Sequence, residues 1–180
     1  KAGRGAARII DRVAGGGIAQ FATRVGIIMR SGPAFAIDLP PTFGINMFDN
    51  VLAFSTQVPG CYSKEELTRL YNLVLCLPDG ARIVEIGVES GRSASVYFQI
   101  AQHKPLQIHL IDSWRDHASA GFCEMTQHFK GVPYTLYAMT SRAALSDGAV
   151  RGINLAHIDG DHGTRAVLDD CQLITDSYIV

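Results

Sequence analysis

The chain has 180 residues, of which 47% are hydrophobic and 18% charged, and its formal net charge is -1. This length and balance fit a single globular domain and exclude an intrinsically disordered chain. Because a nearly neutral chain offers no basic surface to a polyanion, nucleic acid is not expected as a partner.

No apolar run reaches the roughly 18 residues of a membrane-spanning helix, and the N-terminal residues lack the apolar core of a signal peptide. The cysteines are scattered without a C-x-x-C pair, at Cys61, Cys76, Cys123 and Cys171. We therefore expect reduced, mostly buried thiols in a cytoplasmic protein, and neither a disulfide framework nor a zinc site.

Residues 1–50 are expected to form an N-terminal arm with helices, preceding an α/β domain over residues 51–180. Arg4, Arg8 and Arg12 recur every four residues, so a helix would carry them on one face. Two interpretations stay open. The arm is either a basic helix that touches a membrane surface or partner, or a packing or oligomerisation arm with a solvated basic face.

Residues 32–62 have the prolines and scattered aromatics of a long loop, which either covers a substrate or packs on the core. Ser63 and Glu66 then form a capping box that opens a helix. The inward face of this helix is predicted to carry Leu67, Leu70, Tyr71, Val74 and Leu75.

From residue 83 onward, strands alternate with helices. Strands are expected at 83–86, 107–112, 134–139 and 153–158, helices at 92–103, 141–147 and 164–174, and the start of a fifth strand at 178–180. This order predicts a three-layer, Rossmann-like α/β fold with a mainly parallel sheet and helices on both faces. Ligands of such sheets bind at the carboxyl ends of the strands, where four loops of this chain should converge.

The turn from Glu85 to Ser93 joins a strand to a helix, and it exposes backbone N–H groups at the helix N-terminus. A dinucleotide-binding turn reads G-x-G-x-x-G, whereas three residues separate Gly87 from Gly91 here. Glu89 within the turn would repel a pyrophosphate and suit a ligand that carries an ammonium group. The alternative is a plain tight turn.

Asp112 ends the next strand, where a carboxylate can accept hydrogen bonds from both hydroxyls of a ribose. Its alternative role is to cap the following turn. Trp114, the only tryptophan, either stacks beside an adenine or packs on the protein.

Asp159, Asp161 and His162 follow the fourth strand, where charged residues are mostly solvated or functional. A carboxylate pair suits a hard cation such as Mg²⁺. His162 can accept a proton near neutral pH. The alternative is that Asp161 only caps the next helix.

Three segments together resemble class I S-adenosylmethionine-dependent methyltransferases: I-V-E-I-G-V-E-S-G-R-S-A, I-H-L-I-D-S-W and H-I-D-G-D-H. The resemblance covers about residues 55–180. It is closest to the branch with an I-D-G-D-H motif at the fourth strand, which is similar to catechol-type and macrocin-type O-methyltransferases and to cephalosporin-hydroxylase-like proteins.

The resemblance implies S-adenosylmethionine as the cofactor. Its implied binding residues are Glu85, Gly87, Glu89, Ser90, Gly91, Ser93, Asp112, Ser113, Trp114, Thr140, Ser141 and Asp159. It also implies Asp159 and His162 as catalytic residues, with Asp159 and Asp161 as ligands of an assisting Mg²⁺ ion. Further metal ligands that relatives carry after the fifth strand, and the C-terminal strands themselves, are not in this sequence.

The expected reaction is O-methylation of a small hydroxylated acceptor, with self-association into a homo-oligomer as a further possibility. Two alternatives stay open: a catalytically inactive methyltransferase-like binding module, and an NAD-dependent oxidoreductase.

Overall fold

A computed structural model describes residues 8–9, 26–29, 45–114, 118–146, 148 and 150–177, and for 8–9, 26–29, 45–48 and 118 it describes the backbone only. Its strands are β1 (Arg8–Ile9), β2 (Gly26–Met29), β3 (Ala81–Ile86), β4 (Leu106–Ile111), β5 (Tyr134–Tyr137) and β6 (Leu155–Ile158). Its helices are α2 (Ile45–Ser55), α3 (Lys64–Leu75), α4 (Arg92–Ala101), α5 (Ala118–Gln127), α6 (Ser141–Leu145) and α7 (Thr164–Asp176).

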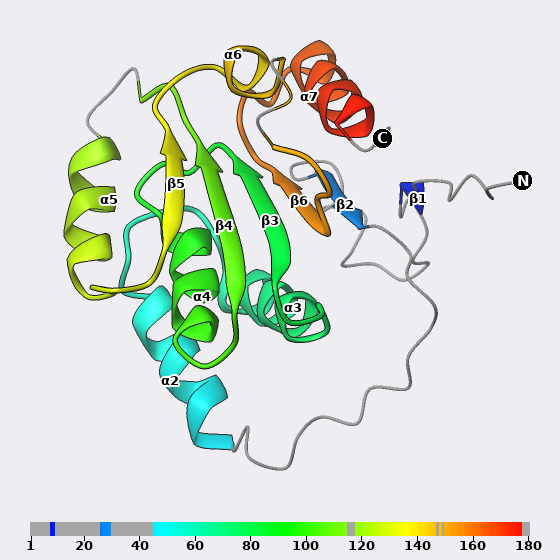
Figure 1. Ribbon diagram of the computed structural model, residues 1–180. Coiled ribbons are helices and arrows are strands. Elements are labelled where there is room, and N and C mark those ends of the chain that lie inside the picture. The colour runs from blue at the N-terminus through cyan, green and yellow to red at the C-terminus, as the bar shows by residue number, and fades with distance from the viewer. Residues whose placement is uncertain are drawn as a thin grey trace, which may run out of the picture.

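The strands form one sheet in the order β1-β2-β6-β3-β4-β5 (Figure 1). Strands β6, β3, β4 and β5 run parallel, in a register that pairs Ile83 with Ile108 and with Leu155. β2 is antiparallel to β6, and β1 is antiparallel to β2. The predicted α/β fold with a mainly parallel sheet is confirmed.

Two apolar clusters cover opposite faces of the sheet, because successive side chains of a strand point to opposite sides. Ala81 and Ile83 of β3 belong to the cluster that includes residues of α2, α3, α4 and α5. Val84 and Ile86 belong to the cluster that includes residues of α6 and α7. This arrangement gives the three predicted layers, and it places Glu85 on the α4 side.

Helix α3 begins at the capping box predicted from the sequence. The amide of Glu66 donates to the Ser63 side chain, and the amide of Ser63 donates to the Glu66 carboxylate. Four of the predicted inward residues are buried, Leu67, Leu70, Tyr71 and Val74, whereas Leu75 is partly buried.

The structure corrects three expectations. Residues 45–55 are helical (α2) although a loop was predicted for 32–62, since Val51 and Leu52 pack into the core on one side. The helix predicted through Arg8 is wrong at Arg8–Ile9, which form β1, while Arg4 and Arg12 lie outside the described residues. The thiols are mostly not buried: Cys61, Cys76 and Cys123 are exposed and Cys171 is half-buried. The start of a fifth strand predicted at 178–180 lies outside the described residues, and β2 pairs with the edge of β6 that faces away from β3.

Among the described residues, no helix combines the length and the apolar character that a membrane crossing requires.

Candidate functional site

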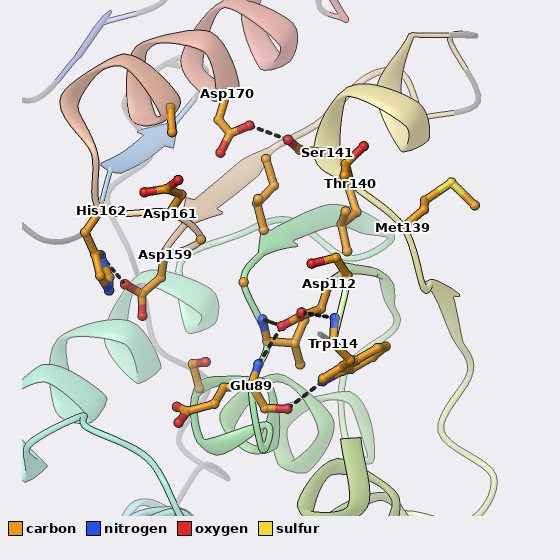
Figure 2. Close-up of a pocket in the computed structure, with 18 of the residues that line it drawn as sticks. Glu89, Asp112, Trp114, Met139, Thr140, Ser141, Asp159, Asp161, His162 and Asp170 are labelled. Carbon is orange, nitrogen blue, oxygen red and sulfur yellow. Dashed lines mark hydrogen bonds and ion pairs between the residues drawn. The ribbon is translucent and has the colours of Figure 1, made fainter. Parts of the chain in front are cut away.

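A cavity of about 1140 Å³ opens at the carboxyl ends of the parallel strands (Figure 2). Its walls come from the loop before α3, the turns after β3, β4 and β6, the segment that enters α6, and one side of α7. The four loops predicted to converge therefore do so. The volume exceeds the roughly 300–1,000 Å³ of a typical single-ligand site, which leaves room for a cofactor and an acceptor.

Most residues predicted to bind a cofactor line this cavity. They are Gly87, Glu89, Ser93, Asp112, Ser113, Trp114, Thr140, Ser141 and Asp159. Asp161 and His162 line it as well. Three predicted residues do not contribute to its lining: Glu85, Ser90 and Gly91. Glu85 and Ser90 are instead buried beneath the turn.

The turn after β3 needs Gly87 because another backbone lies against it. Gly87 has a φ of 86°, and a Cβ atom there would lie 2.1 Å from the carbonyl oxygen of Asp159. Two residues later, Glu89 adopts a positive φ of 52° and presents its carboxylate at the cavity. This close approach holds the turn after β3 directly against the loop that carries Asp159.

Asp112 ties two of the loops together through its carboxylate (Figure 2). Oδ2 accepts hydrogen bonds from the amides of Val88 and Glu89, at 2.7 and 2.8 Å, and Oδ1 accepts one from the amide of Trp114 at 2.8 Å. A carboxylate offers about four acceptor positions, so three are occupied. This leaves about one acceptor position of Asp112 open, and its role in binding the hydroxyls of a ribose stays a prediction.

Trp114 closes the same corner of the cavity. Its indole N–H donates to the carbonyl of Glu89 at 2.9 Å, and its ring packs against Phe122 with centroids 5.3 Å apart. The ring thus forms part of the wall beside the turn, which is compatible with the predicted stacking against an adenine.

The N-terminus of α4 points at the turn without a side-chain cap. Gly91 occupies the N-cap position and supplies no side-chain hydrogen bond, which leaves the helix dipole available to an anionic group. The hydroxyl of Ser93, predicted to lie near a cofactor carboxylate, instead donates to Glu85. Burial raises the pKa of Glu85, and this effect outweighs the contacts with His157 and Ser93 that lower it. Glu85 is therefore a supporting residue, not a lining residue.

Hydrogen bonds at the start of α6 shape the wall of the cavity between α6 and α7. Thr140 caps α6 by accepting from the amide of Ala143, and the hydroxyl of Ser141 donates to Asp170 of α7. Burial raises the pKa of Asp170, an effect that the Ser141 hydrogen bond partly offsets.

Asp159 and His162 face each other across the loop after β6 (Figure 2). The Asp159 Oδ1 atom lies 3.9 Å from Nδ1 of His162, whose side chain is 68% exposed. The Asp161 carboxylate accepts from the amide of Gly163 at 2.8 Å, so it shapes the turn before α7. Among the described residues, no group of three or more His, Cys, Asp or Glu side chains could hold a metal ion. The donor set thus does not fit the predicted Mg²⁺ site on Asp159 and Asp161.

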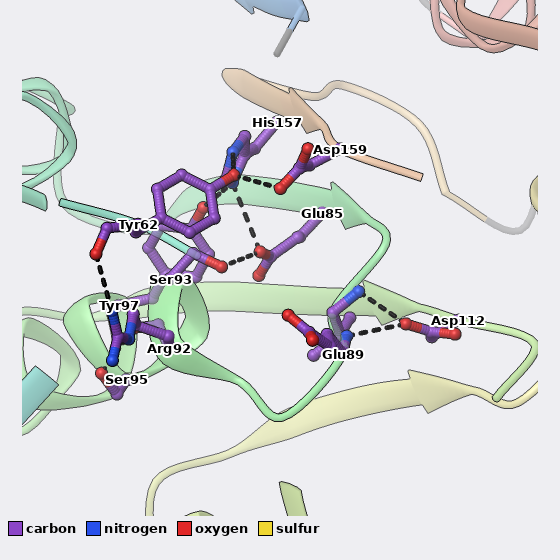
Figure 3. A network of polar contacts seen from close by, with 11 residues as sticks. Tyr62, Glu85, Glu89, Arg92, Ser93, Ser95, Tyr97, Asp112, His157 and Asp159 are labelled. Atoms are coloured by element: carbon purple, nitrogen blue, oxygen red, sulfur yellow. Dashed lines mark hydrogen bonds and ion pairs between the residues drawn. The ribbon is translucent and has the colours of Figure 1, made fainter. Parts of the chain in front are cut away.

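Sequence reasoning missed Tyr62 and His157, which form a polar network behind Asp159 (Figure 3). The hydroxyl of Tyr62 lies 2.5 Å from Asp159 Oδ2 and 2.8 Å from Nε2 of His157. Nδ1 of the fully buried His157 lies 2.6 Å from the hydroxyl of Tyr97. The one available signal was a histidine within an otherwise apolar strand, directly before the I-D-G-D-H motif.

The described lining is strongly acidic. Its carboxylate residues are Glu66, Glu89, Asp112, Asp159, Asp161, Asp169 and Asp170, and its arginines are Arg92 and Arg142. Arg92 is engaged with backbone carbonyls, and Arg142 lies 3.7 Å from the Asp169 carboxylate. Such a cavity favours a ligand with positive charge.

The family model described as "Methyltransferase domain" matches residues 84–178, just over half of the chain. The match includes the glycine turn, Asp112 and the I-D-G-D-H segment, and it begins after Tyr62. No curated protein matches the chain.

Proposed function

The chain belongs to the methyltransferase-domain family, and from this premise we propose that it transfers a methyl group from S-adenosylmethionine to a hydroxyl of a small acceptor. The observation that carries the proposal is the position of the acidic cavity, which unites the glycine turn, Asp112 and the Asp159–His162 pair at the strand ends. Within the family, the O-methyltransferase branch with an I-D-G-D-H motif remains our assignment by resemblance.

The residues of the cavity fit the proposed cofactor in charge. S-adenosylmethionine carries a sulfonium, an ammonium and a carboxylate group, so its net charge is positive. The acidic lining favours the two cations, with Glu89 beside the turn, and the uncapped N-terminus of α4 favours the carboxylate. The acceptor position left on Asp112 is suited to one ribose hydroxyl.

The proposed chemistry needs a proton acceptor and an aligned hydroxyl. When bound, S-adenosylmethionine supplies a methyl group on a positively charged sulfur. His162 takes the proton of the acceptor hydroxyl as the oxygen–methyl bond forms and the sulfur–methyl bond breaks. Asp159 faces Nδ1 of His162, so it leaves Nε2 for the acceptor and stabilises the imidazolium that forms. The cavity walls align the oxygen with the methyl group, which is a positioning effect.

Isothermal titration tests the first step. We expect S-adenosylmethionine and S-adenosylhomocysteine to bind the folded chain, while NAD, the cofactor of the rival oxidoreductase function, does not. Absence of S-adenosylmethionine binding would remove the cofactor assignment. Binding without release of S-adenosylhomocysteine, across a broad panel of hydroxylated small molecules, would favour the inactive binding module.

Turnover of variants tests the second step. We expect His162→Ala to lower kcat by about a hundredfold or more, the contribution typical of a general base. His103→Ala, changed at an exposed position beyond α4, is the matched control. Equal activity of both variants would remove His162 from the mechanism.

The same assay with EDTA and then with Mg²⁺ tests metal assistance, and we expect turnover to persist in EDTA because the described donor set is incomplete.

The cytoplasmic location, the homo-oligomer, the absence of a nucleic-acid partner and the division at residue 50 stay predictions.

A further inference from the structure

Tyr62 links the buried interior to the reacting pair at the cavity. It precedes α3, far from the family motifs in sequence, and yet its hydroxyl lies between Asp159 and His157 (Figure 3). Three guanidinium hydrogen bonds from Arg92 hold the preceding segment, one of them to the carbonyl of Tyr62 itself at 2.7 Å. Hydrogen bonds therefore hold both the backbone carbonyl and the phenol hydroxyl of Tyr62.

The hydrogen atoms of this network can be counted. Tyr62 has one hydroxyl proton, and it donates that proton to Oδ2 of Asp159. The contact with His157 must then run the other way, with the Nε2–H of His157 donating to the phenol oxygen. In a neutral imidazole the other nitrogen is an acceptor, so the hydroxyl of Tyr97 donates to Nδ1.

Every donor in this chain of bonds points the same way, from Tyr97 through His157 and Tyr62 to Asp159. Glu85 also faces this imidazole: its Oε1 lies 3.3 Å from Nδ1, and its other oxygen is buried with no hydrogen-bond partner in the described part of the chain. Burial favours the neutral form of such a carboxyl group, so Glu85 does not require a proton on Nδ1 of His157. The chain of bonds then ends on the carboxylate of Asp159, at the cavity.

We propose that Tyr62 is a positioning residue for the Asp159–His162 pair, the part of the site that would act on the acceptor hydroxyl. By occupying Oδ2 of Asp159 from the interior, it turns Oδ1 toward His162 and the cavity. His157 and Tyr97 keep the phenol proton directed at Asp159. The inference rests on the proposed function for its catalytic consequence, while the arrangement itself does not depend on the identity of the acceptor.

Histidine ring NMR tests the arrangement without any acceptor. In ¹⁵N-histidine-labelled protein we expect the buried ring of His157 to be neutral, with Nε2 protonated and Nδ1 not. Tyr62→Phe should shift the ring signals of His157 and also those of His162, because the Asp159 carboxylate loses its anchor. The His162 signals are identified by their loss in His162→Ala.

Two further variants separate positioning from general stabilisation. Tyr97→Phe removes a hydroxyl from the same imidazole, and it should move the His157 signals while it moves those of His162 less than Tyr62→Phe does. Tyr134→Phe, on the edge strand and 40% exposed, should move neither. An Nδ1-protonated or doubly protonated His157, or unchanged His162 signals in Tyr62→Phe, would overturn the proposal.

Turnover with an acceptor from the panel gives the second readout. Tyr62→Phe should lower kcat about tenfold, the value of one hydrogen bond to a charged group, with an unchanged KM for S-adenosylmethionine. Tyr97→Phe should lower kcat less, although it should lower Tm at least as much, because Tyr97 is fully buried. A purely structural role of Tyr62 predicts that kcat follows Tm in both variants, and that result also contradicts the proposal.

Failure of the proposed function looks different. If the wild-type chain does not bind S-adenosylmethionine or turns over no acceptor, the NMR comparison still decides whether Tyr62 positions Asp159.

Discussion

At the scale of single residues, Gly87 carries two separate constraints. Its φ of 86° is one that side chains disfavour, and the carbonyl of Asp159 occupies the space that a Cβ atom would need. Gly131 shares only the first constraint, since it has a φ of 94° and no atom within 4 Å of a Cβ atom. The pair thus separates backbone strain from steric overlap.

We predict that Gly131→Ala lowers the free energy of unfolding by about 1–2 kcal/mol, because alanine disfavours a left-handed backbone conformation by about that amount. Gly87→Ala should cost about 2–5 kcal/mol, because overlap with the Asp159 backbone adds to the strain. Urea denaturation of both variants measures the difference. Similar losses would mean that the turn moves away from the Asp159 loop at little cost.

Asp112 combines an observed structural role with the ligand-binding role that we propose for it. In Asp112→Asn the side chain keeps one oxygen, so at least one of the three backbone N–H groups faces an amide nitrogen. We predict a stability loss of about 1–3 kcal/mol, together with weaker S-adenosylmethionine binding. Asp79→Asn, in the exposed turn before β3, is the control. If denaturation shows no loss while titration shows weaker binding, Asp112 acts on the ligand alone.

At the scale of elements, hydrogen bonds from Arg92 connect the segment between α2 and α3 to the start of α4. Its guanidinium donates to the carbonyls of Val58, Tyr62 and Thr56, at 2.5, 2.7 and 3.2 Å. A lysine ammonium is a single point and cannot span three such acceptors. The geometry of this arginine therefore connects the start of α4 and the turn after β3, where we propose that the cofactor binds, to the segment that carries Tyr62.

We predict that Arg92→Lys raises hydrogen–deuterium exchange in residues 56–62 and lowers kcat, while α4 itself keeps its protection. Arg82→Lys, whose guanidinium contacts the exposed Gln107 side chain on the sheet, is the matched control. Unchanged exchange in residues 56–62 would show that packing alone holds the segment.

The limits of prediction from the sequence also appear at this scale. The capping box at Ser63 and the glycine turn could be predicted because their residues lie within a few positions of each other. The convergence of Asp112 and Asp159 followed from one rule about parallel strands. The contact of Tyr62 with Asp159 spans 97 residues and depends on how Arg92 directs the chain before α3, so no local pattern encodes it.

At the scale of the whole molecule, the sheet separates two carboxyl groups whose burial favours their protonated forms. Glu85 lies on the α4 side, and Asp170 lies in α7 on the other side. Burial raises the pKa of each above its ordinary value, which is 4.5 for Glu85 and 3.8 for Asp170. For both groups, the free energy of unfolding should therefore fall as the pH rises above the ordinary pKa of the carboxyl group.

For Glu85 the sign follows from proton counting. Above pH 4.5 the unfolded chain loses the Glu85 proton while the folded chain still holds it, so the folded state binds more protons. The free energy of unfolding should then fall by up to about 1.4 kcal/mol per pH unit, from pH 4.5 until the raised pKa is passed.

Glu85→Gln cannot lose this proton, so urea denaturation should show its stability rising relative to wild type across that window. Glu124→Gln, at an exposed position of α5, controls for the loss of a carboxylate. A constant difference between Glu85→Gln and wild type would mean that Glu85 is ionised in the folded protein, paired with a charged His157.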